Sequence, residues 1–117
     1  DGSYGFEQNR PGWGVPIHQL LVSNNVTAVF HGHDHLFVQQ ELDGIIYQEI
    51  PQPGSARPNS TDSAADYGYV NGTILGGPGH MRVTVSSEQV IVDYVRSYIE
   101  EKPAQQNGQV DFSYTIK

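Results

Sequence analysis

Hydrophobic residues occur at helical spacing only near the start of the chain. Ile17, Leu20 and Leu21 share one face of a helix and follow Pro16, whose missing N–H is not needed in a first helical turn. Asn24-Asn25 then provides a stop signal. We therefore expect a short helix here, preceded by a surface loop.

A continuous apolar run follows this helix. Residues Val26–Phe30 are β-branched or apolar throughout, which predicts a strand buried on both faces, typical of a parallel strand covered by helices. The run leads directly into His31-Gly32-His33-Asp34-His35. Because ligands of open α/β sheets bind at the carboxyl ends of strands, these five residues are the first place to look for a site.

Beyond residue 35 the pattern changes to alternation with a period of two. Residues 36–42 and 45–50 flank Asp43-Gly44, a two-residue turn signal that predicts a hairpin. Further strands are predicted over 81–85, 90–98 and 110–116, with a long loop over 51–79 and a polar connector over 99–108. The expected fold class is α+β: a short helix, a buried strand, then antiparallel hairpins.

Composition excludes several classes of function. The 117 residues contain no cysteine, so there are no disulfides, thiolate metal sites or cysteine nucleophiles. Six Lys and Arg against 13 Asp and Glu give a net charge of −7, which argues against nucleic-acid binding. No apolar run approaches the roughly 20 residues that a membrane span needs. The chain lacks a starting methionine and a leader, so we interpret it as a piece of a longer protein; a secreted or periplasmic compartment is favoured.

The candidate chemistry lies in the five residues after the apolar run. His33 and His35 are two apart, so on an extended strand end both imidazoles would project to the same side. Two neutral imidazoles that converge at a sheet edge suit a divalent metal ion. We expect His33 and His35 to be metal ligands.

The sequence Phe30-His31-Gly32-His33-Asp34-His35 resembles the last signature, G-H-x-H, of the calcineurin-like metallophosphoesterases. The preceding helix, the hairpin at Leu42–Tyr47 and the segment Gly79–Val85 are also similar to that family. The resemblance implies an αββα sandwich in which two divalent or trivalent ions (Mn, Fe or Zn) support hydrolysis of phosphate mono- or diesters. It also implies that His33 binds one ion and His35 the other.

The family's earlier signatures are absent from this sequence: Asp-x-His, Gly-Asp-x-x-Asp, Gly-Asn-His-Asp/Glu and a further isolated His. Residues 1–117 therefore resemble the C-terminal segment of such a hydrolase, and we assign no catalytic residue to them. A two-metal hydrolase needs a bridging oxygen ligand between ions about 3.5–4 Å apart, so the chain alone is expected to be inactive. Its expected partner is the missing N-terminal half, or a second copy joined through sheet edges.

Other residues leave alternatives open. His31 is expected to make a structural hydrogen bond, or else to contact substrate or donate from outside the metal shell. Asp34 either orients a ligand imidazole or caps the turn. His18 is expected to face solvent, and Tyr67 and Tyr69 either gate a substrate or cover the surface. The alternative function is a small β-rich binding module in which the histidines are incidental.

Overall fold

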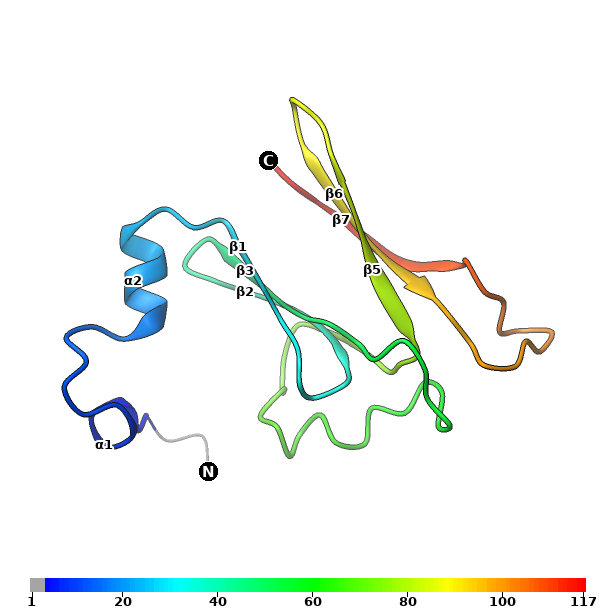
Figure 1. Ribbon diagram of the computed structural model, residues 1–117, viewed down its shortest axis with the longest axis horizontal. Helices are drawn as coiled ribbons and strands as arrows, with labels where there is room; N and C mark the ends of the chain where they lie inside the picture. Colours follow the sequence, from blue (N-terminus) through cyan, green and yellow to red (C-terminus); the bar gives the residue numbers. More distant parts are fainter. Residues whose placement is uncertain (1–3) are drawn as a thin grey trace.

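The structure, a computed structural model, describes residues 4–117, which form two short helices and seven strands (Figure 1). The helices are α1 (Phe6–Asn9) and α2 (Ile17–Ser23). The strands are β1 (Ala28–His31), β2 (Phe37–Leu42), β3 (Ile45–Glu49), β4 (Thr73–Leu75), β5 (Gly79–Val85), β6 (Val90–Arg96) and β7 (Val110–Ile116). Neither helix in this described part is long and apolar enough to cross a membrane.

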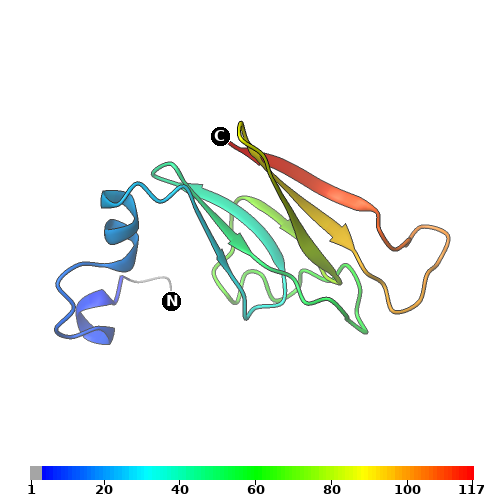
Figure 2. The same ribbon diagram turned by 45° about the horizontal axis from the view of Figure 1, so that its top comes forward.

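The strands form two sheets that pack against each other (Figures 1 and 2). Sheet A has the order β1-β3-β2-β4, with β1 parallel to β3 and the other pairs antiparallel, and sheet B is the antiparallel meander β5-β6-β7. Phe37 of sheet A stacks on Tyr94 of sheet B at a ring-centroid distance of 4.8 Å and meets Phe112 edge-on at 5.5 Å. These aromatic contacts join the two sheets.

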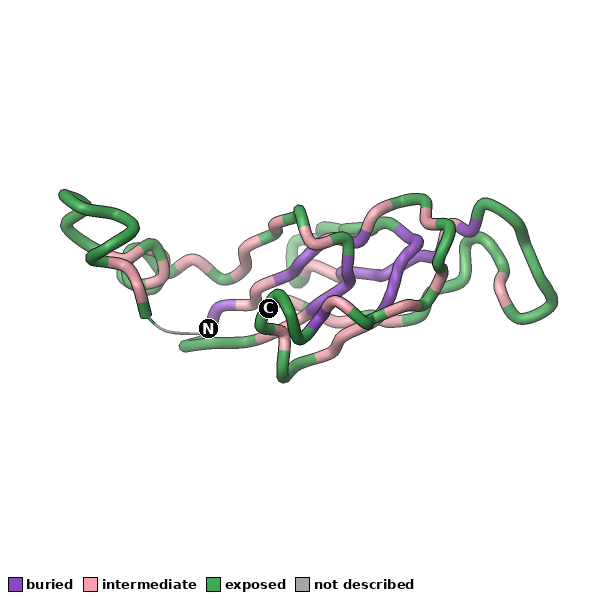
Figure 3. The backbone as a smooth tube through the Cα atoms, turned by 90° about the horizontal axis from the view of Figure 1, so that it is seen from below, coloured by how far each residue is buried: buried purple, intermediate pink, exposed green. Residues whose placement is uncertain are grey.

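Strand β2 begins in the most buried part of the molecule. Phe37 points to sheet B, while Leu36 and Val38 point the opposite way, as alternation along a strand requires. There they pack with Ala64, Tyr69 and Ile74. Figure 3 shows that the buried backbone lies in the middle of the molecule, whereas both helices are exposed or half-buried.

The α+β class and the order of local elements agree with the sequence. Helix α2 begins after Pro16 and ends before Asn24, as predicted. The hairpin at Asp43-Gly44, the antiparallel pair β5–β6 and the last strand β7 also form where the pattern placed them. The strands of sheet B make the antiparallel arrangement that the alternation predicted.

The predicted burial of Val26–Phe30 is wrong. Strand β1 covers only Ala28–His31, its residues are half-buried or exposed, and Phe30 is 40% exposed. The reason is its position: among the described residues β1 pairs only with β3, so it is an edge strand of sheet A. Helix α2 does not cover it, but lies beside the turn between β2 and β3 (Figure 1).

The segment 51–79 is more ordered than the expected loop. Strand β4 lies within it and pairs with β2, and Gly79 already belongs to β5. Ala64 and Tyr69 of this segment cover the face of sheet A that points away from sheet B. The sequence pattern did not predict these contacts, because the segment is mostly polar. Before β4, Ala64 and Tyr69 are its two described side chains in the core cluster.

A polar network crosses all three strands of sheet B. Asp93 of β6 lies opposite Arg82 of β5 and Ser113 of β7. Its Oδ1 accepts a hydrogen bond from the Ser113 hydroxyl at 2.7 Å, and its Oδ2 accepts two from Arg82 at 2.8 and 3.0 Å. The Ser113 hydroxyl, then the Arg82 guanidinium, hold the pKa of Asp93 below its ordinary value.

The depressed pKa of Asp93 predicts how stability depends on pH. A carboxyl group whose pKa is lower in the folded than in the unfolded state contributes stability above about pH 4, and the contribution is lost as the pH falls through the folded pKa. We expect Asp93→Asn to unfold at lower urea concentration than wild type at pH 7. The difference should shrink as the pH falls from 4 toward 2. Asp66→Asn, a change at an exposed carboxylate, is the control; an Asp93→Asn profile parallel to wild type would contradict the network's role.

Candidate metal-binding loop

The residues His31–His35, here called the histidine loop, lie over the end of strand β3. Strand β1 ends at His31 and β2 begins at Phe37, but β3 lies between these two strands in sheet A. The chain must therefore cross the end of β3 to pass from one to the other. Because β1 and β3 are parallel, the last residue of β3, Glu49, is the register partner of His31.

Glu49 is the anchor of the histidine loop. Its side chain has no exposed surface, and its Oε1 accepts the backbone N–H of Asp34 at 2.9 Å. Its Oε2 lies 2.6 Å from Nδ1 of His31, and no other described group contacts that oxygen. A buried carboxylate is stable only when such partners replace water, so Glu49 holds both ends of the sequence His31–Asp34 in place.

His31 is held in an orientation that leaves its second nitrogen available. Glu49 occupies the Nδ1 side of the ring, and the side chain of His31 remains 39% exposed. Metal-bound histidines commonly have a carboxylate on the nitrogen that does not bind the metal. The structural contact expected of His31 is therefore present, and the same contact would suit a second role toward a metal ion or a substrate.

Asp34 is held from two sides, and within residues 4–117 no hydrogen bond joins its carboxylate to His33 or His35. Its Oδ2 accepts the Tyr69 hydroxyl at 2.6 Å, while its backbone N–H goes to Glu49. Burial, and then this hydrogen bond to Asp34, raise the pKa of Tyr69 above its ordinary value. Tyr69 thus fastens the histidine loop to the segment 51–79, a contact that sequence reasoning missed.

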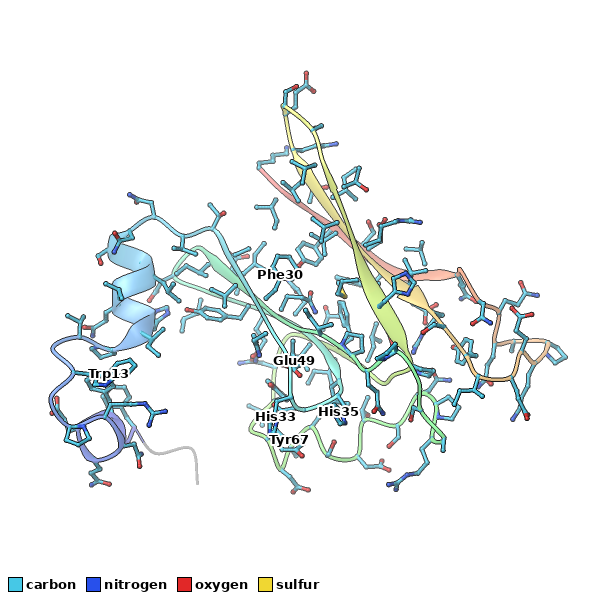
Figure 4. The ribbon with its side chains drawn as sticks, viewed as in Figure 1. Trp13, Phe30, His33, His35, Glu49 and Tyr67 are labelled. Atoms are coloured by element: carbon cyan, nitrogen blue, oxygen red, sulfur yellow. The ribbon has the colours of Figure 1, made fainter. Side chains whose placement is uncertain are left out.

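His33 and His35 are exposed, at the outer end of the loop (Figure 4). The expected extended backbone is wrong here, because His33 has φ of 129° and His35 has φ of 62°. A residue other than glycine with a positive φ raises the conformational energy of the backbone by about 1–3 kcal/mol. Such a conformation persists where the surrounding structure imposes it, often at functional sites. Asp34, which lies between the two histidines, supplies the fixed point through Glu49 and Tyr69.

The chemistry of the loop suits a metal ion, but its ligand set is partial. Within residues 4–117, no three His, Asp or Glu side chains are grouped closely enough to hold an ion. Two exposed imidazoles are suitable nitrogen donors for Zn, Mn or Fe, and no oxygen ligand accompanies them in this part of the chain. A metal ion bound by these two imidazoles would need further ligands from outside the loop.

His18 is placed differently from the expectation. It does not simply face solvent, because its ring contacts the Tyr47 hydroxyl at 2.7 Å and Asp43 Oδ2 at 2.9 Å. These contacts fasten helix α2 to the β2–β3 hairpin. Burial, and then the charge of Asp43, raise the pKa of Tyr47. His18 is therefore a structural residue at the turn between β2 and β3, whereas the histidine loop lies at the other end of these strands.

Comparison of the chain with protein-family models, curated proteins and solved structures finds no match.

The role of Glu49 can be tested by removing its carboxylate. We expect Glu49→Ala to lower the free energy of unfolding by roughly 1–3 kcal/mol, because the Asp34 N–H loses its acceptor. Amide hydrogen exchange over residues 32–35 should accelerate at the same time. Glu49→Gln keeps an acceptor for the Asp34 N–H, so its free energy of unfolding should fall less. Glu41→Ala, on the exposed part of β2, is the control. Unchanged exchange in Glu49→Ala would show that the loop is held by other contacts.

Proposed function

We propose that the chain is the C-terminal segment of a calcineurin-like metallophosphoesterase that hydrolyses phosphate mono- or diesters at a two-metal centre. The observation that carries this proposal is the histidine loop. It presents His33 and His35 to solvent at the carboxyl end of β1, on a backbone fixed by the buried Glu49. Structural histidines are usually engaged in hydrogen bonds, as His18 is, whereas exposed rings on a strained, anchored backbone suit ligand binding.

The proposed fold of the complete enzyme is an αββα sandwich. Two packed sheets supply the inner layers, joined through Phe37. Helix α2 directly precedes β1 in the chain, and we propose that it joins the outer helical layer in the complete enzyme. The remaining helices and strands would come from the N-terminal half of the enzyme.

Two ions, Mn, Fe or Zn, are the proposed cofactors, one bound by an imidazole nitrogen of His33 and the other by His35. When bound, such ions polarise the phosphoryl group and lower the pKa of a coordinated water. The chain's own contribution is positional: Glu49 and Tyr69 fix the backbone that carries both imidazoles, and Glu49 orients His31. His31 lies in the same loop with Nδ1 on Glu49, and in its doubly protonated form its other nitrogen can donate to a substrate oxygen.

The proposed partner is the N-terminal half of the enzyme, docked on the open side of β1. Strand β1 has one unpaired edge, and Phe30 on it is 40% exposed. Ile17 and Leu20 on the neighbouring α2 are each 52% exposed. An apolar strand edge with unpaired backbone groups is a template for another strand, so a second copy of this chain is the alternative occupant.

A small β-rich binding module is the alternative function. It is favoured by one observation: within the described residues, no three potential ligands come together. The two proposals differ in what His33 and His35 do, because an interaction module has no need of their imidazoles.

Metal titration separates the two functions. We expect Zn²⁺ or Mn²⁺ to bind the chain, and we expect the affinity to fall at least about tenfold in the His33→Ala/His35→Ala variant, because the imidazole nitrogens are the donors. Isothermal titration calorimetry measures both. His80→Ala, which removes another exposed histidine, should bind like wild type. Equal affinity in wild type and in the double variant would favour the binding module.

The chain alone is expected to be inactive. Hydrolysis of a nitrophenyl phosphate, measured with added Mn²⁺ or Zn²⁺, should not exceed the rate in buffer with the metal, because the bridging ligand is missing. Metal-dependent turnover that disappears in His35→Ala would contradict this expectation and show that fewer ligands suffice.

A further inference from the structure

A polar cavity of about 260 Å³ lies directly beside the histidine loop. A single water molecule needs only about 10–15 Å³ of such a volume, so the cavity can hold a group much larger than one water. The loop contributes Asp34 and His35 to its wall, and the segment between β3 and β4 contributes most of the rest, including Ser55, Arg57, Ser63 and Tyr67. Figure 4 shows Tyr67 at the same end of the molecule as His33 and His35.

Arg57 is the cation of this wall. The other two arginines of the β-sheet region are already neutralised, Arg82 by Asp93 and Arg96 by Asp111. Among the described residues, Arg57 makes no ion pair of this kind. Its guanidinium therefore retains all its donors for a group that enters the cavity.

The two carboxylates of the wall are already engaged. Asp34 accepts the Tyr69 hydroxyl, and Asp62 accepts the Ser60 hydroxyl at 2.9 Å. Neither carboxylate pairs with Arg57, although both line the same cavity. Their charges oppose an anion, and one oxygen of each carboxylate is held by a neighbouring hydroxyl.

Hydroxyl donors complete the wall around Arg57. The Ser55 oxygen accepts the backbone N–H of Arg57 at 3.1 Å, which leaves its own hydrogen free to donate. Ser63 and Tyr67 add two further hydroxyls. A guanidinium fork surrounded by hydroxyl donors matches the oxygens of a phosphoryl group.

We propose that this cavity is a subsite in which Arg57 binds a second phosphoryl group of the substrate, on the leaving-group side of the bond that is cleaved. The assignment to the leaving group rests on the proposed function, because it places the reacting phosphate at His33 and His35. His35 belongs both to the metal-binding loop and to the cavity wall, so one substrate can reach both. The preferred substrates are then phosphoesters whose leaving group itself carries phosphate, rather than simple aryl phosphates.

The subsite is tested on the metal-free chain, with inorganic phosphate as the probe. We expect ¹H–¹⁵N spectra to show phosphate-dependent shifts over residues 55–63, and we expect Arg57→Gln to weaken phosphate affinity at least about tenfold. Arg10→Gln, a change at an exposed arginine near α1, should bind phosphate within about twofold of wild type. Because Arg57 is exposed, its variant should keep the dispersed spectrum of the folded chain.

A second variant separates phosphate binding from metal binding, and a second anion tests whether the cavity selects phosphate. The His33→Ala variant, which removes a proposed metal ligand that does not line the cavity, should retain phosphate binding that depends on Arg57, even though its metal affinity falls. Wild-type phosphate affinity in Arg57→Gln, or no phosphate binding to the wild-type chain, would overturn the subsite whatever the metal titration shows. Acetate that binds as tightly as phosphate would overturn the assignment to a phosphoryl group.

Discussion

The carboxylate of Glu49 must find partners inside the protein, because it is fully buried at the end of a central strand. The order β1-β3-β2 determines which partners are available. His31 lies opposite Glu49 on one side, and the crossing chain passes directly over its end, where the Asp34 N–H meets it. The conformation of the histidine loop, with its two positive φ angles, follows from that one polar requirement. An apolar residue at position 49 could also be buried, but the Asp34 N–H would lose its acceptor and Tyr69 alone would hold the loop.

The same strand order explains why the loop is backed by ordered structure on both sides. Strand β2 leaves the loop into the core, with Phe37 against sheet B and Leu36 against the segment 51–79. Tyr69, packed on that second side, reaches back to Asp34. The aromatic contact between the sheets and the hydrogen bonds of the loop therefore support each other: a shift of β2 would move Asp34 away from both Glu49 and Tyr69.

Local sequence signals predicted most of the helices and strands. The burial of Val26–Phe30 and the role of Glu49 instead depend on contacts with residues distant in the sequence. A proline at a helix start, an Asp-Gly turn and alternation with a period of two each involve only a few neighbouring residues. The helix and the hairpins that these signals predicted are present in the structure. The apolar run Val26–Phe30 carries no information about whether strands and helices flank it, and in residues 4–117 the one strand paired with β1 is β3. Glu49 was missed because a carboxylate in a strand usually points to solvent. The adjacent buried Gln48 and Glu49 break the alternation of β3, and this break was the one available signal.

The charge distribution links the proposed metal centre to the proposed phosphate subsite. A chain of net charge −7 would repel the proposed phosphoester substrate, whose charge is of the same sign, so positive charge would have to be concentrated where that substrate reacts. Arg82 and Arg96 cannot provide it, because Asp93 and Asp111 neutralise them within sheet B. The proposed ions at His33 and His35, with Arg57 beside them, would supply that charge at one end of the molecule. The acidic remainder would repel anions from the rest of the surface, so an anionic substrate would be directed to that end of the molecule.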